Sequence, residues 1–395
     1  MPQLPDLKEM MEALIAEPSI SSAESGLDHG NERVSALLAN WCLDLGFDVE
    51  VQPVAGKPGH RNVIATAGRG PGGLILGGHS DTVPVDEKLW KSDPFRLVER
   101  DGRLYGLGTT DMKSYFALAF AAVQRCDLRN LKAPLTIIAT ADEETGMSGA
   151  RALRDSAFRG AQAVIGEPTG SRPVRMHKGN TMHRIHLSGQ SGHSSNPAFG
   201  NSALEGMHEV ITELLAYRSE LQQRYRNPGF AVPTPTLNLG CIHGGDNPNR
   251  ICGACELSFD LRVLPGIDGT EIIDTLKRRV EGIAARRKLG VSIETIMALV
   301  PGLETPAGAA IVRAAERLTG FDAEAVAFTT EAPFYQQHGL DVVVMGPGDI
   351  GCAHQPDEHI RVDRLQPTIH HLTSLIQDFC VAPSVAPVHQ RMNSR

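Results

Sequence analysis

The fold of this chain is decided by the run Leu74-Ile75-Leu76-Gly77-Gly78-His79-Ser80-Asp81-Thr82-Val83-Pro84. Its first residues form a short, continuous apolar segment, which is typical of a strand buried on both faces of a sheet. An imidazole and a carboxylate, His79 and Asp81, follow at the carboxyl end of that strand. Ligands of open α/β sheets bind at this edge. The pair also suits a metal-ligating histidine and the acceptor for its second ring N–H.

An isolated pair of this kind is more often an ordinary hydrogen-bonded loop than a metal site. Here, however, further imidazole and carboxylate groups stand after predicted strands or strand exits. They are Asp111, Glu143, Glu144, Glu167 and His354. This recurrence favours one shared site over coincidence.

At 395 residues the chain is longer than one hydrophobic core usually supports, so two domains are expected. Up to Glu167, helices and apolar strands largely alternate, which indicates an α/β fold with a covered sheet. Between 181 and 297 the predicted order is β-α-β-β-α-β, that of a ferredoxin-like unit. We therefore expect a catalytic domain built from 1–180 and 298–382, interrupted by an insert at 181–297. The composition of 383–395, rich in proline and polar residues, predicts a disordered tail.

The periodicity also predicts individual elements. Helices are expected at about 113–126, 202–225, 268–287 and 363–379, and strands at about 182–187, 236–242, 255–263 and 290–296. Cys252 and Cys255 have the spacing of half a zinc site. Because no second pair with suitable spacing exists, we interpret these two cysteines as structural.

The composition is that of an ordinary soluble protein, with 41% apolar residues, 21% charged residues and a net charge of −8. It gives no reason to expect nucleic acid or an acidic membrane surface as a partner. No apolar stretch is long enough to cross a bilayer, and the first six residues lack the pattern of a signal peptide. Seven dispersed cysteines suit a reducing cytoplasm better than a disulfide framework, so a cytoplasmic protein is expected.

The donor set His79, Asp111, Glu144, Glu167 and His354 is a poor match for one tetrahedral zinc ion. Two imidazoles and three carboxylates suit two divalent ions that share one bridging carboxylate. Three carboxylates leave one positive charge from the two ions, and a bridging hydroxide neutralises it. Such a water ionises near neutral pH and gives a nucleophile without an activated serine or cysteine.

Glu143 is the candidate general base, because it is left uncoordinated if Glu144 faces the metal. One carboxylate can take a proton from water and deliver it to the leaving amine of an amide. An acidic pair alone is more often solvated, but this pair follows a buried strand, and Asp142 is expected to be the solvated residue. Serine-hydrolase elbow, P-loop, dinucleotide-binding and His-Glu-x-x-His motifs are absent from the sequence.

With these residues in place, the chain resembles the cocatalytic-zinc family of aminoacylases, succinyl-diaminopimelate desuccinylases, carboxypeptidases and acetylornithine deacetylases. The likeness extends from about Leu7 to Cys380. The motifs most similar to the deacetylase branch are Val51-Gln52-Pro53-Val54, Tyr105-Gly106-Leu107-Gly108, Ala139-Thr140-Ala141-Asp142-Glu143-Glu144, Val174-Arg175-Met176-His177-Lys178-Gly179, Thr236-Leu237-Asn238-Leu239-Gly240 and Ala353-His354-Gln355-Pro356-Asp357-Glu358. The Gly-Thr-Ser-Asp and Asn-Gly-Arg-Arg segments of the desuccinylase branch are missing here.

The resemblance implies a zinc-peptidase-like catalytic domain with a covered mixed sheet, and an inserted ferredoxin-like lid domain that pairs two subunits into a homodimer. It also implies that His79 and Glu167 hold one metal ion, that Glu144 and His354 hold the other, and that Asp111 bridges the two. Zinc is the expected metal, and cobalt can substitute for it.

Further roles follow from the same resemblance. Asp81 would orient His79, Glu143 would be the base, and the Asp111–Met112 peptide is a candidate for the cis form. His193 would donate to the developing oxyanion from the lid of a partner subunit. From its sequence context alone, an ordinary loop histidine is the more frequent explanation.

Six residues are candidates for binding the substrate, namely Lys178, Asn249, Arg250, Arg262, Glu331 and Gly348. Asn249, Arg250 and Arg262 suit an α-carboxylate, since a planar guanidinium holds a carboxylate with two hydrogen bonds. Arg262 equally suits a charge on a strand surface. Glu331 is placed to meet a cationic side chain such as that of ornithine, or to cap the helix after it. Gly348 is expected to shape the rim of the pocket.

The expected function is metal-dependent hydrolysis of N2-acetyl-L-ornithine to L-ornithine and acetate in arginine biosynthesis, by a metal-bound hydroxide with a glutamate base. The alternative is a broader N-acyl-amino-acid deacylase of the acetylcitrulline, acetylmethionine or succinyl-diaminopimelate type. A catalytically silent scaffold on the same fold is a different class. Such a relative would be expected to have lost some ligands or the base, and all of them are present here.

Overall fold

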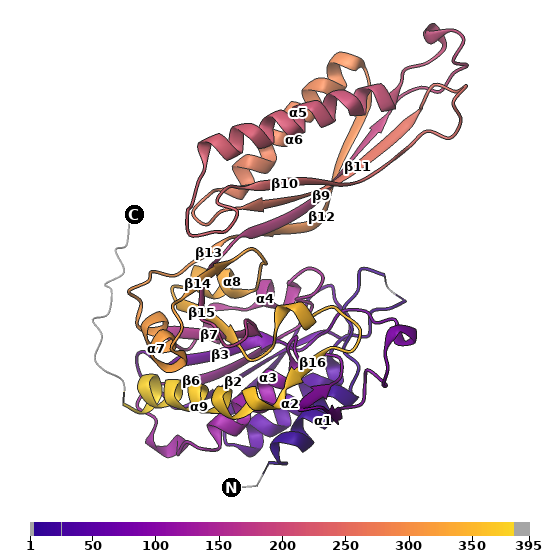
Figure 1. Ribbon diagram of the computed structural model, residues 1–395. Coiled ribbons are helices and arrows are strands. Elements are labelled where there is room, and N and C mark those ends of the chain that lie inside the picture. The colour runs from indigo at the N-terminus through magenta and orange to yellow at the C-terminus, as the bar shows by residue number, and fades with distance from the viewer. Residues whose placement is uncertain (1–3, 25, 383–395) are drawn as a thin grey trace. The chain divides into compact units, whose positions relative to one another are not determined.

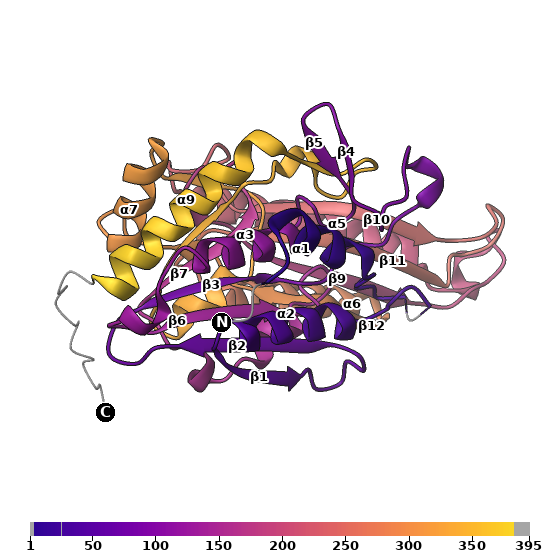
Figure 2. The same cartoon turned by 90° about the horizontal axis from the view of Figure 1, so that it is seen from below.

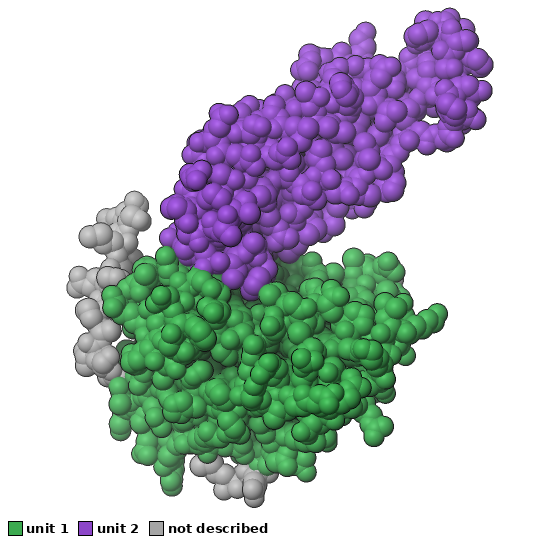
Figure 3. Space-filling model, in the orientation of Figure 1, with its two compact units in different colours: residues 1–175, 305–324, 330–395 green, residues 176–304, 325–329 purple. Residues whose placement is uncertain are grey.

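The computed structural model of the protein describes residues 4–24 and 26–382. The chain divides into two compact units, coloured separately in Figure 3. Unit 1 takes residues 1–175, 305–324 and 330–395, and unit 2 takes residues 176–304 and 325–329. The insert predicted from the sequence spans 181–297. The predicted disordered tail, 383–395, lies outside the described residues.

The central sheet of unit 1 is mixed, as predicted. Its strands in spatial order are β1 (Asp48–Pro53), β2 (Arg61–Ala67), β6 (Leu135–Thr140), β3 (Leu74–His79), β7 (Gln162–Pro168), β15 (Asp341–Gly346) and β8 (Val174–His177). The four strands β6, β3, β7 and β15 are mutually parallel neighbours, whereas β1, β2 and β6 pair antiparallel. Four adjacent strands therefore end at one edge of this sheet.

Helices cover both faces of that sheet (Figures 1 and 2). One face carries α1 (Leu7–Ala16), α2 (Glu32–Asp44), α3 (Lys113–Val123), α7 (Ala310–Thr319) and α9 (Leu365–Ile376), and the other carries α4 (Ser148–Ala152) and α8 (Ala332–Gln337). Leu74 and Leu76 of β3 belong to the hydrophobic core that includes residues of α1, α2, α3, α7 and α9. Ile75, which lies between them in the sequence, does not belong to it. This alternation follows from the two-residue repeat of a strand, and β3 is apolar from Leu74 to Leu76 because both of its faces are covered.

Five short strands complete unit 1 and the connections to unit 2. They are β4 (Val98–Arg100), β5 (Arg103–Tyr105), β16 (His359–Arg361), β13 (Leu303–Glu304) and β14 (Glu324–Val326). Strands β16, β5 and β4 form a three-stranded sheet. The pairing of β5 with β16 joins two segments that lie some 250 residues apart in the sequence, as the register His359 with Tyr105 shows.

Unit 2 confirms the predicted β-α-β-β-α-β order. It runs β9 (Gly179–Ser188), α5 (Ala203–Arg224), β10 (Thr236–Gly244), β11 (Ala254–Val263), α6 (Gly269–Arg287) and β12 (Gly290–Val300). The antiparallel sheet has the order β10-β11-β9-β12, and α5 and α6 pack on one of its faces around a separate core (Figure 1). Ser202 and Asp268 cap the two helices by accepting hydrogen bonds from their first turns.

Cys252 and Cys255, which the sequence indicates to be structural, are buried free thiols in the core of unit 2. None of the helices within the described ranges is both long and apolar enough to span a bilayer.

Candidate metal centre

The residues predicted as metal ligands lie at the carboxyl ends of the parallel strands of unit 1. His79 is the last residue of β3, Glu144 follows β6, and Glu167 lies near the end of β7. Asp111 lies two residues before the start of α3, and His354 lies in the loop between β15 and β16. The cis peptide bond expected between Asp111 and Met112 is present.

Asp111 stands between the two imidazoles. Its Oδ1 is 3.0 Å from Nε2 of His79, and its Oδ2 is 3.5 Å from Nε2 of His354. His354 Nε2 also lies 3.0 Å from Glu144 Oε2, and His79 Nε2 lies 3.9 Å from Glu167 Oε1. The five predicted ligands are therefore brought together, with one carboxylate facing both histidines.

The donor atoms fit divalent cations. Two sets of three groups have their ligand atoms within 4.8 Å of one another, namely His79 with Glu143 and Glu167, and His79 with Asp111 and Glu144. Glu167 Oε1 is buried and has no hydrogen-bond donor in the part of the chain that the structure describes. Imidazole nitrogen and carboxylate oxygen are ordinary ligands for zinc. A cation held by these groups would satisfy the otherwise unpartnered oxygen of Glu167.

Negative charge is concentrated at this edge of the sheet. Burial, followed by the neighbouring Glu167 carboxylate, raises the pKa of Glu143 well above its ordinary value. Burial, followed by the neighbouring Asp111 carboxylate, also raises the pKa of Glu144. The same two causes raise the pKa of Glu167 well above its ordinary value. Hydrogen bonds to Asp111 and Glu144 raise the pKa of His354 to about 10. Crowded carboxylates hold protons more tightly, and bound metal ions displace such protons.

Asp81 contacts the ring of His79 through its backbone oxygen. His79 Nδ1 lies 3.0 Å from the backbone oxygen of Asp81 but 3.7 Å from its carboxylate. The carboxylate itself is fully buried and accepts hydrogen bonds of 3.2 Å from the backbone N–H groups of Glu143 and Glu144. Its carbonyl therefore sets the ring of His79, and its side chain fixes the loop that carries the candidate base.

The expectation that Asp142 is solvated is wrong. Its side chain is fully buried and pairs with Lys57, whose Nζ lies 2.8 Å from Asp142 Oδ1. It also accepts hydrogen bonds from the Thr145 hydroxyl and the Ser148 backbone N–H. Sequence reasoning missed this anchor, because Lys57 lies 85 residues away in a loop with no motif of its own.

Glu331 and Gly348, predicted to bind substrate, also lie in unit 1. Glu331 is fully buried, and its carboxylate is hydrogen-bonded to the hydroxyls of Thr140 and Tyr335. Its side chain does not cap α8, which was the alternative predicted from the sequence. Gly348 packs against the loop that leads to Asp111, since a Cβ atom there would lie 2.7 Å from the backbone oxygen of Thr110.

The other substrate candidates belong to unit 2. His193, Asn249 and Arg250 are exposed and come from two adjoining loops, joined by a bridge between His193 and Arg250 and by a 3.0 Å bond from Ser194 N to Asn249 O. The side chains of the other two candidates, Arg262 and Lys178, already form hydrogen bonds within the chain. Arg262 contacts Asp260 and Thr329, and the ammonium group of Lys178 donates to the backbone oxygen of Thr234 at 2.7 Å.

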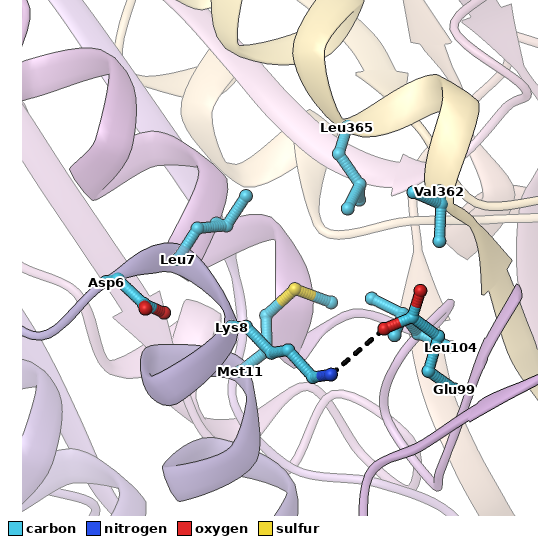
Figure 4. Close-up of a pocket in the computed structure, with 8 residues that line it drawn as sticks. All are labelled: Asp6, Leu7, Lys8, Met11, Glu99, Leu104, Val362 and Leu365. Carbon is cyan, nitrogen blue, oxygen red and sulfur yellow. Dashed lines mark hydrogen bonds and ion pairs between the residues drawn. The ribbon is translucent and has the colours of Figure 1, made fainter. Parts of the chain in front are cut away.

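A separate cavity of about 320 Å³ lies in unit 1 between α1 and the residues around β4, β5 and the start of α9 (Figure 4). An ion pair between Lys8 and Glu99, at 2.9 Å, crosses it. Its lining is Asp6, Leu7, Lys8, Met11, Glu99, Leu104, Val362 and Leu365, which includes none of the predicted ligands.

Comparison with known families agrees with this geometry. Residues 75–378 match the family described as Peptidase family M20/M25/M40. The match spans most of the chain, and the chain belongs to this family. It is a metal-dependent hydrolase.

The similarity to characterised relatives extends over nearly the whole chain. Acetylornithine deacetylase of Edwardsiella ictaluri is 50% identical over 379 residues, which cover 96% of this chain and 99% of that protein. Acetylornithine deacetylase of Erwinia tasmaniensis is 47% identical with the same coverage. The structure of the M20 family metallo-carboxypeptidase Sso-CP2 from Sulfolobus solfataricus aligns with a TM-score of 0.76 at 18% identity, over 95% of this chain and 99% of that one. At that identity the likeness concerns the fold.

Proposed function

We propose that this enzyme hydrolyses N2-acetyl-L-ornithine to L-ornithine and acetate, as a step of arginine biosynthesis in the cytoplasm. The observation that carries the metal-dependent part is the position of Asp111, whose two carboxylate oxygens face the imidazoles of His79 and His354 at 3.0 and 3.5 Å. The substrate is taken from the two relatives that are about half identical over almost their full length.

Five residues would hold two divalent ions, with zinc as the expected metal and cobalt as a substitute. His79 and Glu167 would hold one ion, Glu144 and His354 the other, and Asp111 both. This division follows the resemblance to the family, and the distances of 3.9 Å from His79 Nε2 to Glu167 Oε1 and 3.0 Å from His354 Nε2 to Glu144 Oε2 support it. Once bound, the ions supply Lewis-acid polarisation of the acyl carbonyl and a water that ionises near neutral pH.

Glu143 would move the proton. Burial and the neighbouring Glu167 raise its pKa, so it shuttles a proton more readily near neutral pH than an ordinary glutamate does. It takes the proton from water and delivers it to the leaving amine nitrogen. The hydrogen bond from its backbone N–H to Asp81 keeps Glu143 at the metal edge of the sheet while the proton is transferred.

Unit 2 would supply recognition. His193 would donate to the oxyanion, and Asn249, Arg250 and Arg262 would bind the α-carboxylate, with Lys178 beside them. Since His193, Asn249 and Arg250 are exposed on unit 2, we propose that this unit also pairs two subunits into a homodimer and closes over the substrate.

Glu331 bears on the choice of substrate. A buried carboxylate that is already bonded to Thr140 and Tyr335 is unsuited to pair with the side-chain ammonium of ornithine. This observation favours the second candidate, a broader N-acyl-amino-acid deacylase that also accepts neutral side chains. The two candidates differ in their ratio of rates on acetylornithine, acetylcitrulline and acetylmethionine.

The test is acetate release from these substrates, and succinate release from succinyl-diaminopimelate, by zinc- or cobalt-loaded protein alongside Glu143→Ala. The parent is expected to release acetate fastest from acetylornithine. The variant is expected to lose about two or more decades in kcat, with its metal content unchanged. Faster release from a neutral substrate would overturn the ornithine assignment, and no release from any of them would overturn the reaction.

A further inference from the structure

Glu358 is a buried carboxylate that belongs to neither of the two donor groups described above. It is 2% exposed and lies four residues after His354. One of its oxygens, Oε1, accepts three backbone hydrogen bonds, from the N–H groups of Gly108 at 3.0 Å, Thr110 at 2.8 Å and Asp111 at 3.0 Å. A single side-chain oxygen therefore holds the loop that presents Asp111.

The local backbone makes this convergence possible. Gly108 has a φ of +84°, a conformation open to glycine, which helps nearly successive N–H groups point to one acceptor. A Cβ atom at this position would also lie 2.7 Å from the side chain of Lys113. The concave row of N–H groups is thus built into the sequence Gly106–Asp111, and Glu358 fills it.

The same two segments are joined at other points. The backbone N–H of Gly106 donates to the backbone oxygen of Glu358 at 3.0 Å, and the Thr110 hydroxyl donates to the backbone oxygen of His359 at 2.6 Å. These bonds lie close to Glu358 Oε1 but do not involve the peptide N–H of Asp111. Only the carboxylate of Glu358 links that N–H to the segment that carries His354.

We propose that Glu358 is a positioning residue for the metal pair, whose carboxylate oxygen holds loop 108–111 so that Asp111 reaches both ions. The inference rests on the proposed function, because it requires two ions in the site. Two divalent ions repel each other, and a shared carboxylate offsets that repulsion. The second ion therefore depends more than the first on the exact placement of Asp111.

The test is a calorimetric titration of the metal-free full-length chain with Co²⁺, combined with the visible absorption spectrum after each equivalent. The parent is expected to bind two ions. Glu358→Ala is expected to keep the first and to bind the second about 10- to 100-fold more weakly, with an altered spectrum. Glu358→Gln is expected to behave like the parent, because its amide oxygen accepts the same three N–H groups.

Two further variants keep the test decisive. If Glu358→Ala does not fold, Glu358→Asp replaces it, since it withdraws the acceptor by one methylene group and keeps the charge. Thr110→Val is the matched control, because it removes a hydrogen bond between the same segments without freeing the N–H of Asp111. It is expected to bind both ions with the parent's affinity.

The outcomes separate this inference from the proposed function. A parent that binds only one ion contradicts the proposed metal pair and removes the basis of the inference with it. A parent that binds two ions, with Glu358→Ala or Glu358→Asp binding both equally well, overturns the role of Glu358 alone. Weakening in Thr110→Val or Glu358→Gln as large as in Glu358→Ala also overturns it, since loop loosening or lost charge then explains the effect.

Discussion

Two pairs of candidate residues, His79 and Asp81 of unit 1 and His193 and Arg250 of unit 2, are held in opposite ways. In unit 1, His79 and Asp81 are buried and hydrogen-bonded to atoms of neighbouring strands or loops, so their positions are set by the fold. In unit 2, His193 and Arg250 are exposed, and their side chains contact residues of their own loops, Ser195 and Asp246. The proposed metal ligand and its neighbour are therefore preorganised, whereas the two proposed recognition residues are free to adjust to a ligand or partner.

The largest expected effect is that of bound metal, which we expect to stabilise unit 1 and not unit 2. Removal of metal is expected to abolish acetate release, since the chain offers no other nucleophile motif. Zinc at about 1,000 times its Kd is expected to stabilise unit 1 by about 4 kcal/mol, because only the folded site gathers the ligands. Hydrogen exchange of the backbone amides of β3 and β9, compared with and without zinc, measures the stabilisation of each unit in one experiment. Equal protection of β9 would show that the metal also stabilises unit 2 and would break the comparison.

A second effect concerns His177, the last residue of β8, the strand in which the chain passes from unit 1 to unit 2. Burial lowers the pKa of His177 to about 4, below the ordinary value of 6.5. The folded state therefore stays neutral where the unfolded state takes up a proton. This difference in pKa contributes to the free energy of unfolding. Its contribution is fully present above pH 6.5 and is lost as the pH falls toward 4, by about 3 kcal/mol at most.

The measurement is urea unfolding, followed by hydrogen exchange between pH 7 and 4, for the parent and for His177→Leu. The variant is expected to lose part of the acid sensitivity of the parent. Identical pH profiles for the two proteins would mean that His177 titrates normally in the folded state.

The contrast between the units also explains what the sequence could predict. His79, Glu144 and Glu167 stand directly at or after apolar strands, so local periodicity and the rule for strand ends are enough to bring them together. The β-α-β-β-α-β order of unit 2 follows from the same kind of local pattern. Each of these predictions depends on residues close to one another in the sequence.

The missed features depend on partners that are far apart in the sequence. Glu331 meets Thr140 across 191 residues, and Glu358 meets Asp111 across 247. The sequence around a carboxylate that lies next to a motif does not tell whether the carboxylate faces a ligand or accepts hydrogen bonds from the backbone. Only the topology, which returns the chain to unit 1 after the insert, makes Glu358 and Glu331 interior groups.

Asp81→Asn tests how far preorganisation in unit 1 matters. The asparagine keeps the backbone oxygen that bonds His79 Nδ1, but it replaces one of the two oxygens that hold Glu143 and Glu144 with an amide donor. We expect kcat to fall about 10- to 100-fold, with metal content preserved. Kinetics and metal analysis of the same sample measure both quantities. If Asp81→Asn instead loses a metal ion while kcat per metal-loaded site changes little, the main role of the Asp81 carboxylate is to orient His79.

The smallest effect on stability, and the sharpest test of unit 2, is Arg250→Ala. Arg250 forms an exposed ion pair with Asp246, and Arg184 forms a comparable exposed pair with Glu294 on the sheet of the same unit. Exposed pairs contribute at most about 1 kcal/mol, so neither Arg250→Ala nor the matched control Arg184→Ala should change unfolding much.

If Arg250 holds the α-carboxylate, its loss should lower kcat/KM about tenfold or more, mainly through KM, because a charged hydrogen bond in the complex is removed. Arg184→Ala should retain the parent's value. The substrate amide, which lacks the carboxylate, should react equally with the parent and Arg250→Ala. A similar loss on both substrates would mean that Arg250 shapes its loop instead, and unit 2 would then resemble unit 1, with side chains that hold backbone rather than ligand.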